Sequence, residues 1–279
     1  MCIRDSVNSY LILQYLRYYI RARTRYRVHS PFVFDLVNEV LEDDRHFYVF
    51  DDIERLRVNL LRDKRMLEVT DLGAGSHTTK SNQRSVQSIA RSAVTPSRYT
   101  QFLFSLVHYL KPKTVLEMGT SLGISTLYQA KADGRAQVIT LEGCPEIAEV
   151  AQENFKRLNA NNIELMIGDF AKTLPQALQK IQRVDYVFFD GNHRKAPTLN
   201  YFREALKYAH EDSVFVFDDI YWSEEMMEAW EEIKAHPQVT LTIDIFYMGI
   251  VFFRKENLTK EHFTLIDSWK KPWSMGFFN

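Results

Sequence analysis

From Thr100 onwards, short apolar runs alternate with amphipathic ones. Five apolar runs are typical of strands, at residues 114–118, 137–142, 162–167, 184–189 and 213–217. Helical spacing of apolar residues follows the first four of them, over 125–131, 147–158, 174–181 and 199–208. This alternation predicts a parallel sheet with helices on both faces. The runs 184–189 and 213–217 are apolar throughout, as strands buried on both faces are.

A different pattern follows Ile220. A helix is predicted through Met226 and Ile233, ending near His236-Pro237. Two strand-like runs, TLTIDIF and GIVFFRK, then flank a turn near Gly249, which predicts an antiparallel hairpin at the edge of the sheet. The predicted fold class is therefore α/β: a doubly wound, mostly parallel sheet with a C-terminal antiparallel hairpin and an N-terminal helical region.

The N-terminal 95 residues are predicted to be mainly helical. Ser30-Pro31 is a helix start, with serine as N-cap and proline at the first position, and apolar residues follow at helical spacing. A second helical pattern covers residues 51–65, and another covers 102–110, ended by Lys111-Pro112. We expect a helical region over 1–95 and a ligand-binding catalytic domain over 96–279.

Five arginines, from Arg17 to Arg27, stand among aromatic residues in the first predicted helix. Such a helix can lie on an acidic partner or a membrane surface. The simpler interpretation, which we favour, docks its Tyr and Leu face on the domain and leaves the arginines in water.

Composition narrows the class of protein. A net charge of −1 gives no general attraction to nucleic acid or membranes. Two cysteines form no disulfide framework, which indicates a reducing compartment, and we expect a cytoplasmic protein. No run is long and apolar enough to cross a bilayer.

The strand at 114–118 runs into a glycine-rich turn, Glu117-Met-Gly119-Thr120-Ser121-Leu-Gly123. Gly119 allows a tight turn and close approach of a ligand. Ser121, Ser125 and Thr126 place hydroxyls at a helix N-terminus, where free N–H groups favour a carboxylate. The alternative is a purely structural turn.

Polar residues also end the following strands. Glu142 lies 23 residues after Gly119, close to the spacing of an acid that holds a ribose diol. Gly168-Asp169-Phe170 is placed to flank an adenine, and Asp190 ends the fourth strand. Dinucleotide sites need G-x-G-x-x-G for a pyrophosphate, whereas this turn is Gly119-x-x-x-Gly123. We therefore expect a ligand without phosphates, whose carboxylate meets the turn.

Residues 114–221 resemble class I S-adenosylmethionine-dependent methyltransferases, within them the catechol O-methyltransferase-like group. VLEMGTSLGIST resembles that group's first motif, and VITLEGCPEIAEVAQENF resembles its ribose-binding strand and helix. IELMIGDFAKTLPQAL, VDYVFFDGNH and SVFVFDDIYWS resemble the later strands. The resemblance implies a Rossmann-like fold and S-adenosylmethionine as cofactor. The expected cofactor-binding residues are Glu117, Gly119, Thr120, Ser121, Gly123, Ser125, Glu142, Gly168, Asp169, Phe170 and Asp190.

A similar glycine-rich turn, Asp71-Leu-Gly-Ala-Gly75, is set aside. No strand ending in an acid follows it at the required distance. We interpret it as a turn, with a role as a lid left open.

The same resemblance implies chemistry at the acceptor. Asp190, Asp218 and Asp219 fall where the catechol group binds magnesium, although Asp219 replaces an amide there and puts that metal geometry in doubt. The alternative is that Asp190 and Asp218 only hold loops and cofactor. His193 stands where the group has a lysine base, so His193 and Asp190 are the expected catalytic residues. A loop histidine that only caps a strand or binds substrate is the alternative.

The predicted function is methylation of an oxygen on a small or medium acceptor, without nucleic acid and with a homodimer left open. Tyr221, Trp222 and Met248 are candidate pocket walls or core residues, and Cys144 has no visible base that would make it a nucleophile. Two rivals remain: an NAD-linked oxidoreductase on a similar sheet, and a non-catalytic cofactor-binding module that uses the basic helix.

Overall fold

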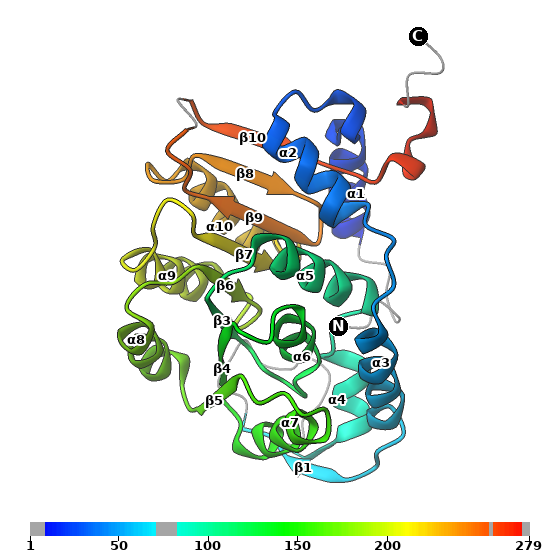
Figure 1. The fold of residues 1–279 in the computed structure, drawn as a ribbon, viewed down its shortest axis with the longest axis vertical. Coiled ribbons are helices and arrows are strands. Elements are labelled where there is room, and N and C mark those ends of the chain that lie inside the picture. Colours follow the sequence, from blue (N-terminus) through cyan, green and yellow to red (C-terminus); the bar gives the residue numbers. More distant parts are fainter. Residues whose placement is uncertain (1–8, 71–82, 257–258, 275–279) are drawn as a thin grey trace.

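The computed structural model describes residues 9–70, 83–256 and 259–274. Figure 1 shows a twisted central sheet with helices on both of its faces and further N-terminal helices at one side. The large sheet has eight strands in the order β10-β8-β9-β7-β6-β3-β4-β5. Its strands are β3 (Thr114–Met118), β4 (Gln137–Glu142), β5 (Ile163–Ile167), β6 (Tyr186–Phe189), β7 (Val214–Asp218), β8 (Leu241–Asp244), β9 (Met248–Phe252) and β10 (Glu261–Thr264).

The predicted parallel sheet is confirmed. Strands β3 to β7 pair in parallel, and β9 is antiparallel to both β7 and β8. The helices between them are α6 (Ile124–Ala132), α7 (Pro145–Arg157), α8 (Phe170–Ile181), α9 (Lys195–Leu206) and α10 (Glu224–Ala235). Each contains or overlaps the helical pattern predicted for its interval.

The hairpin of β8 and β9 is also present, but its predicted position at the sheet edge is wrong. Strand β10 pairs in parallel with β8 and forms the outer strand. The sequence pattern did not predict β10, because Glu261 to Thr264 show too little alternation of apolar and polar residues to indicate a strand. Its backbone pairs with the free edge of β8, which only the assembled sheet provides.

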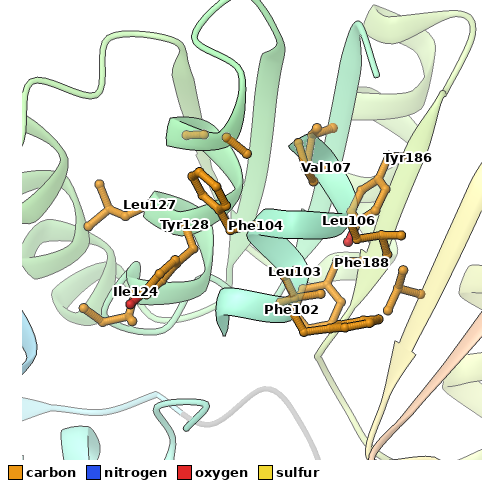
Figure 2. Close-up of a cluster of buried hydrophobic side chains, with 14 of the residues drawn as sticks. Phe102, Leu103, Phe104, Leu106, Val107, Ile124, Leu127, Tyr128, Tyr186 and Phe188 are labelled. Carbon is orange, nitrogen blue, oxygen red and sulfur yellow. The ribbon is translucent and has the colours of Figure 1, made fainter. Parts of the chain in front are cut away.

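Side chains of each strand divide between two cores. Val115 and Phe188 face one core, while their neighbours Leu116 and Phe189 face the other, because successive residues of a strand point to opposite faces. Helices α8, α9 and α10 cover the second core. Helix α5 (Ser97–Leu110) covers the first, and Figure 2 shows Leu103, Leu106 and Val107 of α5 among Tyr186 and Phe188 of β6.

The N-terminal elements extend this first core. They are α1 (Ser9–Arg21), α2 (Pro31–Leu36), α3 (Tyr48–Leu60) and α4 (Val86–Ser92), with a π-helical turn at Val37–Leu41, a 3₁₀ turn at Arg25–Arg27 and a small antiparallel pair, β1 (Met66–Glu68) and β2 (Gln83–Ser85). Val33 of α2 and Ile53 of α3 are fully buried in it. Two further 3₁₀ turns, Ser268–Lys270 and Pro272–Ser274, follow β10.

The structure differs from the sequence-based prediction in three local details. The helix predicted over 51–65 ends at Leu60, where the chain turns before β1. Ser30 precedes Pro31 as predicted, but its side chain makes no capping hydrogen bond. The pair β1 and β2 is absent from the prediction, since each strand is only three residues long. Among the described residues, no helix is long and apolar enough to cross a membrane.

Candidate functional site

The loop after β3 and the loop after β6 touch at the centre of the sheet. Strand β3 has β4 on one side and β6 on the other, so the strand order reverses direction here. Gly119 has a φ of +102°, and a Cβ atom built there would lie 2.3 Å from the carbonyl oxygen of Asp190. Only glycine fits so close to a backbone at this φ. Ligands of open α/β sheets bind at such a reversal point, outside the carboxyl ends of the strands.

Glu117 supports this loop from inside. Its side chain is fully buried and accepts hydrogen bonds from Thr140 Oγ1 and Gln129 Nε2, both at 2.7 Å, and from Thr126 Oγ1. Burial raises the pKa of the Glu117 carboxyl. The hydroxyl of Thr120 likewise turns inward, 2.6 Å from Thr140 Oγ1. Both side chains hold the turn in place, and their direct contact with a cofactor stays a prediction.

The rest of the turn forms the N-terminus of α6. Gly123 is its N-cap in the left-handed conformation, and Ser125 in the first turn is 6% exposed. The hydroxyl of Ser121 is buried without a hydrogen-bond partner among the described residues. An orphaned buried hydroxyl costs free energy unless something satisfies it, so this atom fits a polar ligand group.

Glu142 joins the turn to the end of β4. Its carboxylate accepts hydrogen bonds from the backbone N–H of Ser121 at 2.8 Å and of Cys144 at 2.9 Å. Burial raises the pKa of this carboxyl, and the backbone donors oppose that rise. Two carboxylate oxygens have about four acceptor positions, so two remain for the hydroxyls of a ribose. The residues present therefore fit the ribose and carboxylate ends of S-adenosylmethionine.

The third predicted segment follows β5. Asp169 caps α8 by accepting a hydrogen bond from the backbone N–H of Ala171 at 2.9 Å, and the Gly168 N–H donates to the Glu142 carbonyl oxygen at 2.8 Å. The ring of Phe170 lies over Gly191, where a Cβ atom would come within 2.4 Å of it. This places an aromatic side chain between the loops after β5 and β6, next to Asp190.

Carboxyl groups gather where β6 and β7 end. Asp190 and Asp218 share a hydrogen bond, and burial is the largest cause that raises the pKa of both well above the usual range. The charge of Asp218 adds to the rise at Asp190, and the charge of Asp219 adds to the rise at Asp218. His193 Nε2 lies 3.6 Å from Asp190 Oδ1, and both side chains are largely covered. Asp219 follows with a φ of +53°, a conformation that few non-glycine residues adopt. Asp190, His193 and Asp218 thus meet at one place.

The predicted magnesium site receives no support from this geometry. In residues 9–70, 83–256 and 259–274, no three Asp, Glu, His or Cys side chains are arranged to hold a metal ion.

Aromatic residues that the sequence pattern did not single out stand near these acids. Tyr99 of α5 and Tyr247 of the β8–β9 turn lie with ring centroids 4.5 Å apart, and burial is the largest cause that raises the pKa of Tyr99, with Asp218 a smaller one. Tyr221 donates a 2.5 Å hydrogen bond to Asp244. Trp222 is half-buried, whereas Met248 is fully buried in the core, so it is not a pocket wall. The lookalike turn at Asp71–Gly75 lies outside the described residues.

The part of the chain that is similar to known proteins includes the loops after β3, β4, β5 and β6. Residues 116–220 match the family model described as a methyltransferase domain. The segment is 32% identical over 123 residues to a catechol O-methyltransferase of Niastella koreensis, covering 43% of this chain and 55% of the relative. A catechol O-methyltransferase of Mycobacterium tuberculosis is 34% identical over 122 residues, covering 43% and 54%. The chain thus spans about half the length of the curated relatives it matches.

Solved structures support the fold over a longer stretch. A putative O-methyltransferase from Klebsiella pneumoniae superposes with a TM-score of 0.55 at 19% identity, covering 79% of this chain and 94% of that one. An O-methyltransferase from Bacillus cereus in complex with SAH gives 0.51 at 22% identity, covering 79% and 96%. The predicted Rossmann-like fold is confirmed, and residues 116–220 are similar to a methyltransferase domain.

Proposed function

We propose that this protein is an S-adenosylmethionine-dependent O-methyltransferase that acts on a small or medium acceptor. The observation that carries the proposal is the turn after β3: Glu142 accepts from the Ser121 N–H, the Ser121 hydroxyl has no partner among the described residues, and the Asp190 backbone lies against Gly119. The likeness of residues 116–220 to O-methyltransferases adds support.

S-adenosylmethionine, when bound, supplies an electrophilic methyl group on a sulfonium sulfur, and an acceptor oxygen takes this methyl group by displacing the sulfur directly. The protein then mainly positions the two reactants. Glu142 would hold the ribose hydroxyls, and Ser121 with the N-terminus of α6 would hold the carboxylate. Phe170 would cover one side of the adenine beside Gly191.

An acceptor hydroxyl must also lose its proton. His193 is the proposed base, and Asp190 is the residue that orients it, through Nε2 at 3.6 Å. A ring whose Nε2 hydrogen points at Asp190 has its proton-accepting nitrogen, Nδ1, free for the acceptor. Nδ1 would take the proton that the hydroxyl loses as its oxygen bonds to the methyl carbon and the carbon–sulfur bond breaks, leaving a neutral thioether.

Calorimetric titration tests cofactor binding. Glu142→Ala removes a charged acceptor, and we expect it to weaken S-adenosylmethionine binding about 10- to 150-fold. Glu142→Gln, which keeps the size and one acceptor, should weaken it less. Glu164→Ala is the matched control, because Glu164 in neighbouring β5 pairs with Lys180 at the surface. Unchanged affinity in Glu142→Ala would refute this site, and tight NAD binding without S-adenosylmethionine binding would refute the proposed activity.

Transfer of a labelled methyl group to hydroxylated acceptors tests catalysis. We expect His193→Gln to lower kcat about 10²- to 10⁴-fold while S-adenosylmethionine affinity is retained. An unchanged kcat would exclude His193 as the base. Magnesium stays a prediction: loss of transfer in EDTA, restored by Mg²⁺, would support it, and full activity in EDTA would exclude it. Cofactor binding with no transfer to any acceptor would favour the non-catalytic alternative.

A further inference from the structure

Helix α1 has apolar residues on two faces. Its inner face carries Tyr18 and Ala22, which are buried against Phe246 and Ile266. Its outer face carries four large aliphatic residues that are about half exposed or more: Ile12 at 47%, Leu13 at 47%, Leu16 at 52% and Ile20 at 79%. Their spacing of three and four residues places them in one stripe along the helix. We call these four residues the outer face of α1.

Specific bonds hold the helix so that the outer face stays outward. The Tyr18 hydroxyl donates to the Leu265 carbonyl oxygen, and the Tyr19 hydroxyl donates to the Lys270 carbonyl oxygen at 2.9 Å. Just beyond the helix, the Arg23 N–H donates to the Thr264 carbonyl oxygen at 2.8 Å. Figure 1 shows α1 at one end of the molecule, beside the segment that follows β10. The predicted docking of the Tyr and Leu face therefore holds for Tyr18, which is buried, and is wrong for Leu13 and Leu16, which are about half exposed.

Exposed cations and tryptophans accompany the outer face. Arg17 and Arg21 are exposed, and residues Ser9–Arg21 contain no acid. Trp273 is 58% exposed, with its ring 6.3 Å from the ring of Tyr19, so it lies beside the stripe. Trp269 is 65% exposed between cations, 5.7 Å from Arg98 and 5.4 Å from the Lys270 ammonium. Aliphatic residues, arginines and a neighbouring tryptophan, Trp273, are the composition of helices that lie in a lipid interface.

We propose that the outer face of α1 binds the surface of a membrane that contains anionic lipids. The aliphatic stripe enters the headgroup boundary, and Arg17 and Arg21 contact the negative headgroups. The C-terminal half of the helix, with Ile20 and Trp273, leads the contact, because the exposed acid Glu224 lies toward the other end, near Tyr10. A second copy is a poorer occupant, since a symmetric interface centred here would bring arginines together without an acid of α1 to pair with them.

Co-sedimentation of the full chain with vesicles tests the proposal. We expect binding to vesicles of phosphatidylcholine with phosphatidylglycerol, weak binding to pure phosphatidylcholine, and weakening by salt. Leu16→Ser with Ile20→Ser should abolish binding. Arg17→Gln with Arg21→Gln should weaken it about 25-fold, at about fivefold for each charge. The matched control is Val58→Ser on α3 with Arg62→Gln in the turn after it. This pair removes a 43% exposed apolar residue and an exposed cation elsewhere and should leave binding unchanged.

Thermal unfolding of each variant shows that the fold is retained, and S-adenosylmethionine titration reports on the methyltransferase site separately. Three results would overturn the proposal. One is no binding to the anionic vesicles, and another is binding that the Leu16 and Ile20 changes leave intact. The third is a dimer in sedimentation velocity that the same two changes dissociate, which would assign the outer face to a second copy of the chain.

Discussion

Replacing Gly119 by alanine tests the contact on which the whole site depends. A side chain at a φ of +102° costs about 1–3 kcal/mol in backbone strain. The new Cβ atom would also lie 2.3 Å from the Asp190 carbonyl oxygen, and the Asp190 N–H is itself bonded to the Met118 carbonyl oxygen at 2.9 Å. The obstacle is therefore backbone tied to β3 and cannot rotate aside. Overpacking of this kind adds about 1–3 kcal/mol.

The expected loss of unfolding free energy is thus about 2–6 kcal/mol. At about 2–4 °C per kcal/mol for a chain of this size, Tm should fall by roughly 4–24 °C in a calorimetric scan. Gly134→Ala is the control, because a Cβ atom there meets nothing within 4 Å and alanine should change stability by less than about 1 kcal/mol. Equal Tm values for the two variants would mean that the β3 and β6 loops do not touch as described.

Two further changes test the electrostatics and the attachment of the N-terminal region. Asp244 is 7% exposed, and burial raises the pKa of its carboxyl above the value in the unfolded chain. Between these two pKa values the folded state binds the extra proton. The free energy of unfolding therefore falls as the pH rises from the unfolded pKa through the folded pKa. Asp244→Asn should remove this fall. The Tm of the wild type should then drop relative to the Tm of the variant between acid and neutral pH. A Tm difference that stays constant with pH would contradict the raised pKa of Asp244. Tyr128→Phe removes the 2.8 Å hydrogen bond from Tyr128 of α6 to Glu54 of α3. It should lower the free energy of unfolding in urea by about 1–2 kcal/mol. An unchanged free energy of unfolding would mean that the Tyr128 hydroxyl bonds to water and not to Glu54.

The strand-end loops of the candidate site were predictable because their signals are local. Gly119, Glu142 and Asp190 each follow an apolar strand, and parallel strands bring their carboxyl ends to one edge whatever their order. Tyr99 and Tyr247 carried no such signal. They come from α5 and from the β8–β9 turn, 148 residues apart, and meet only because both segments pack beside the end of β7.

The sequence by itself determined the core elements of this protein, since strands buried on both faces need continuous apolar runs and their helices need a single apolar stripe. Strands β3 and β4 begin and end at the residues predicted. Tertiary structure decided what lies outside that core. Helix α1 has apolar residues on opposite faces, so periodicity alone cannot say which face is buried; the contacts of Tyr18 with Leu265 and Phe246 select the inner one. Strand β10 likewise exists because β8 offers it an unpaired edge.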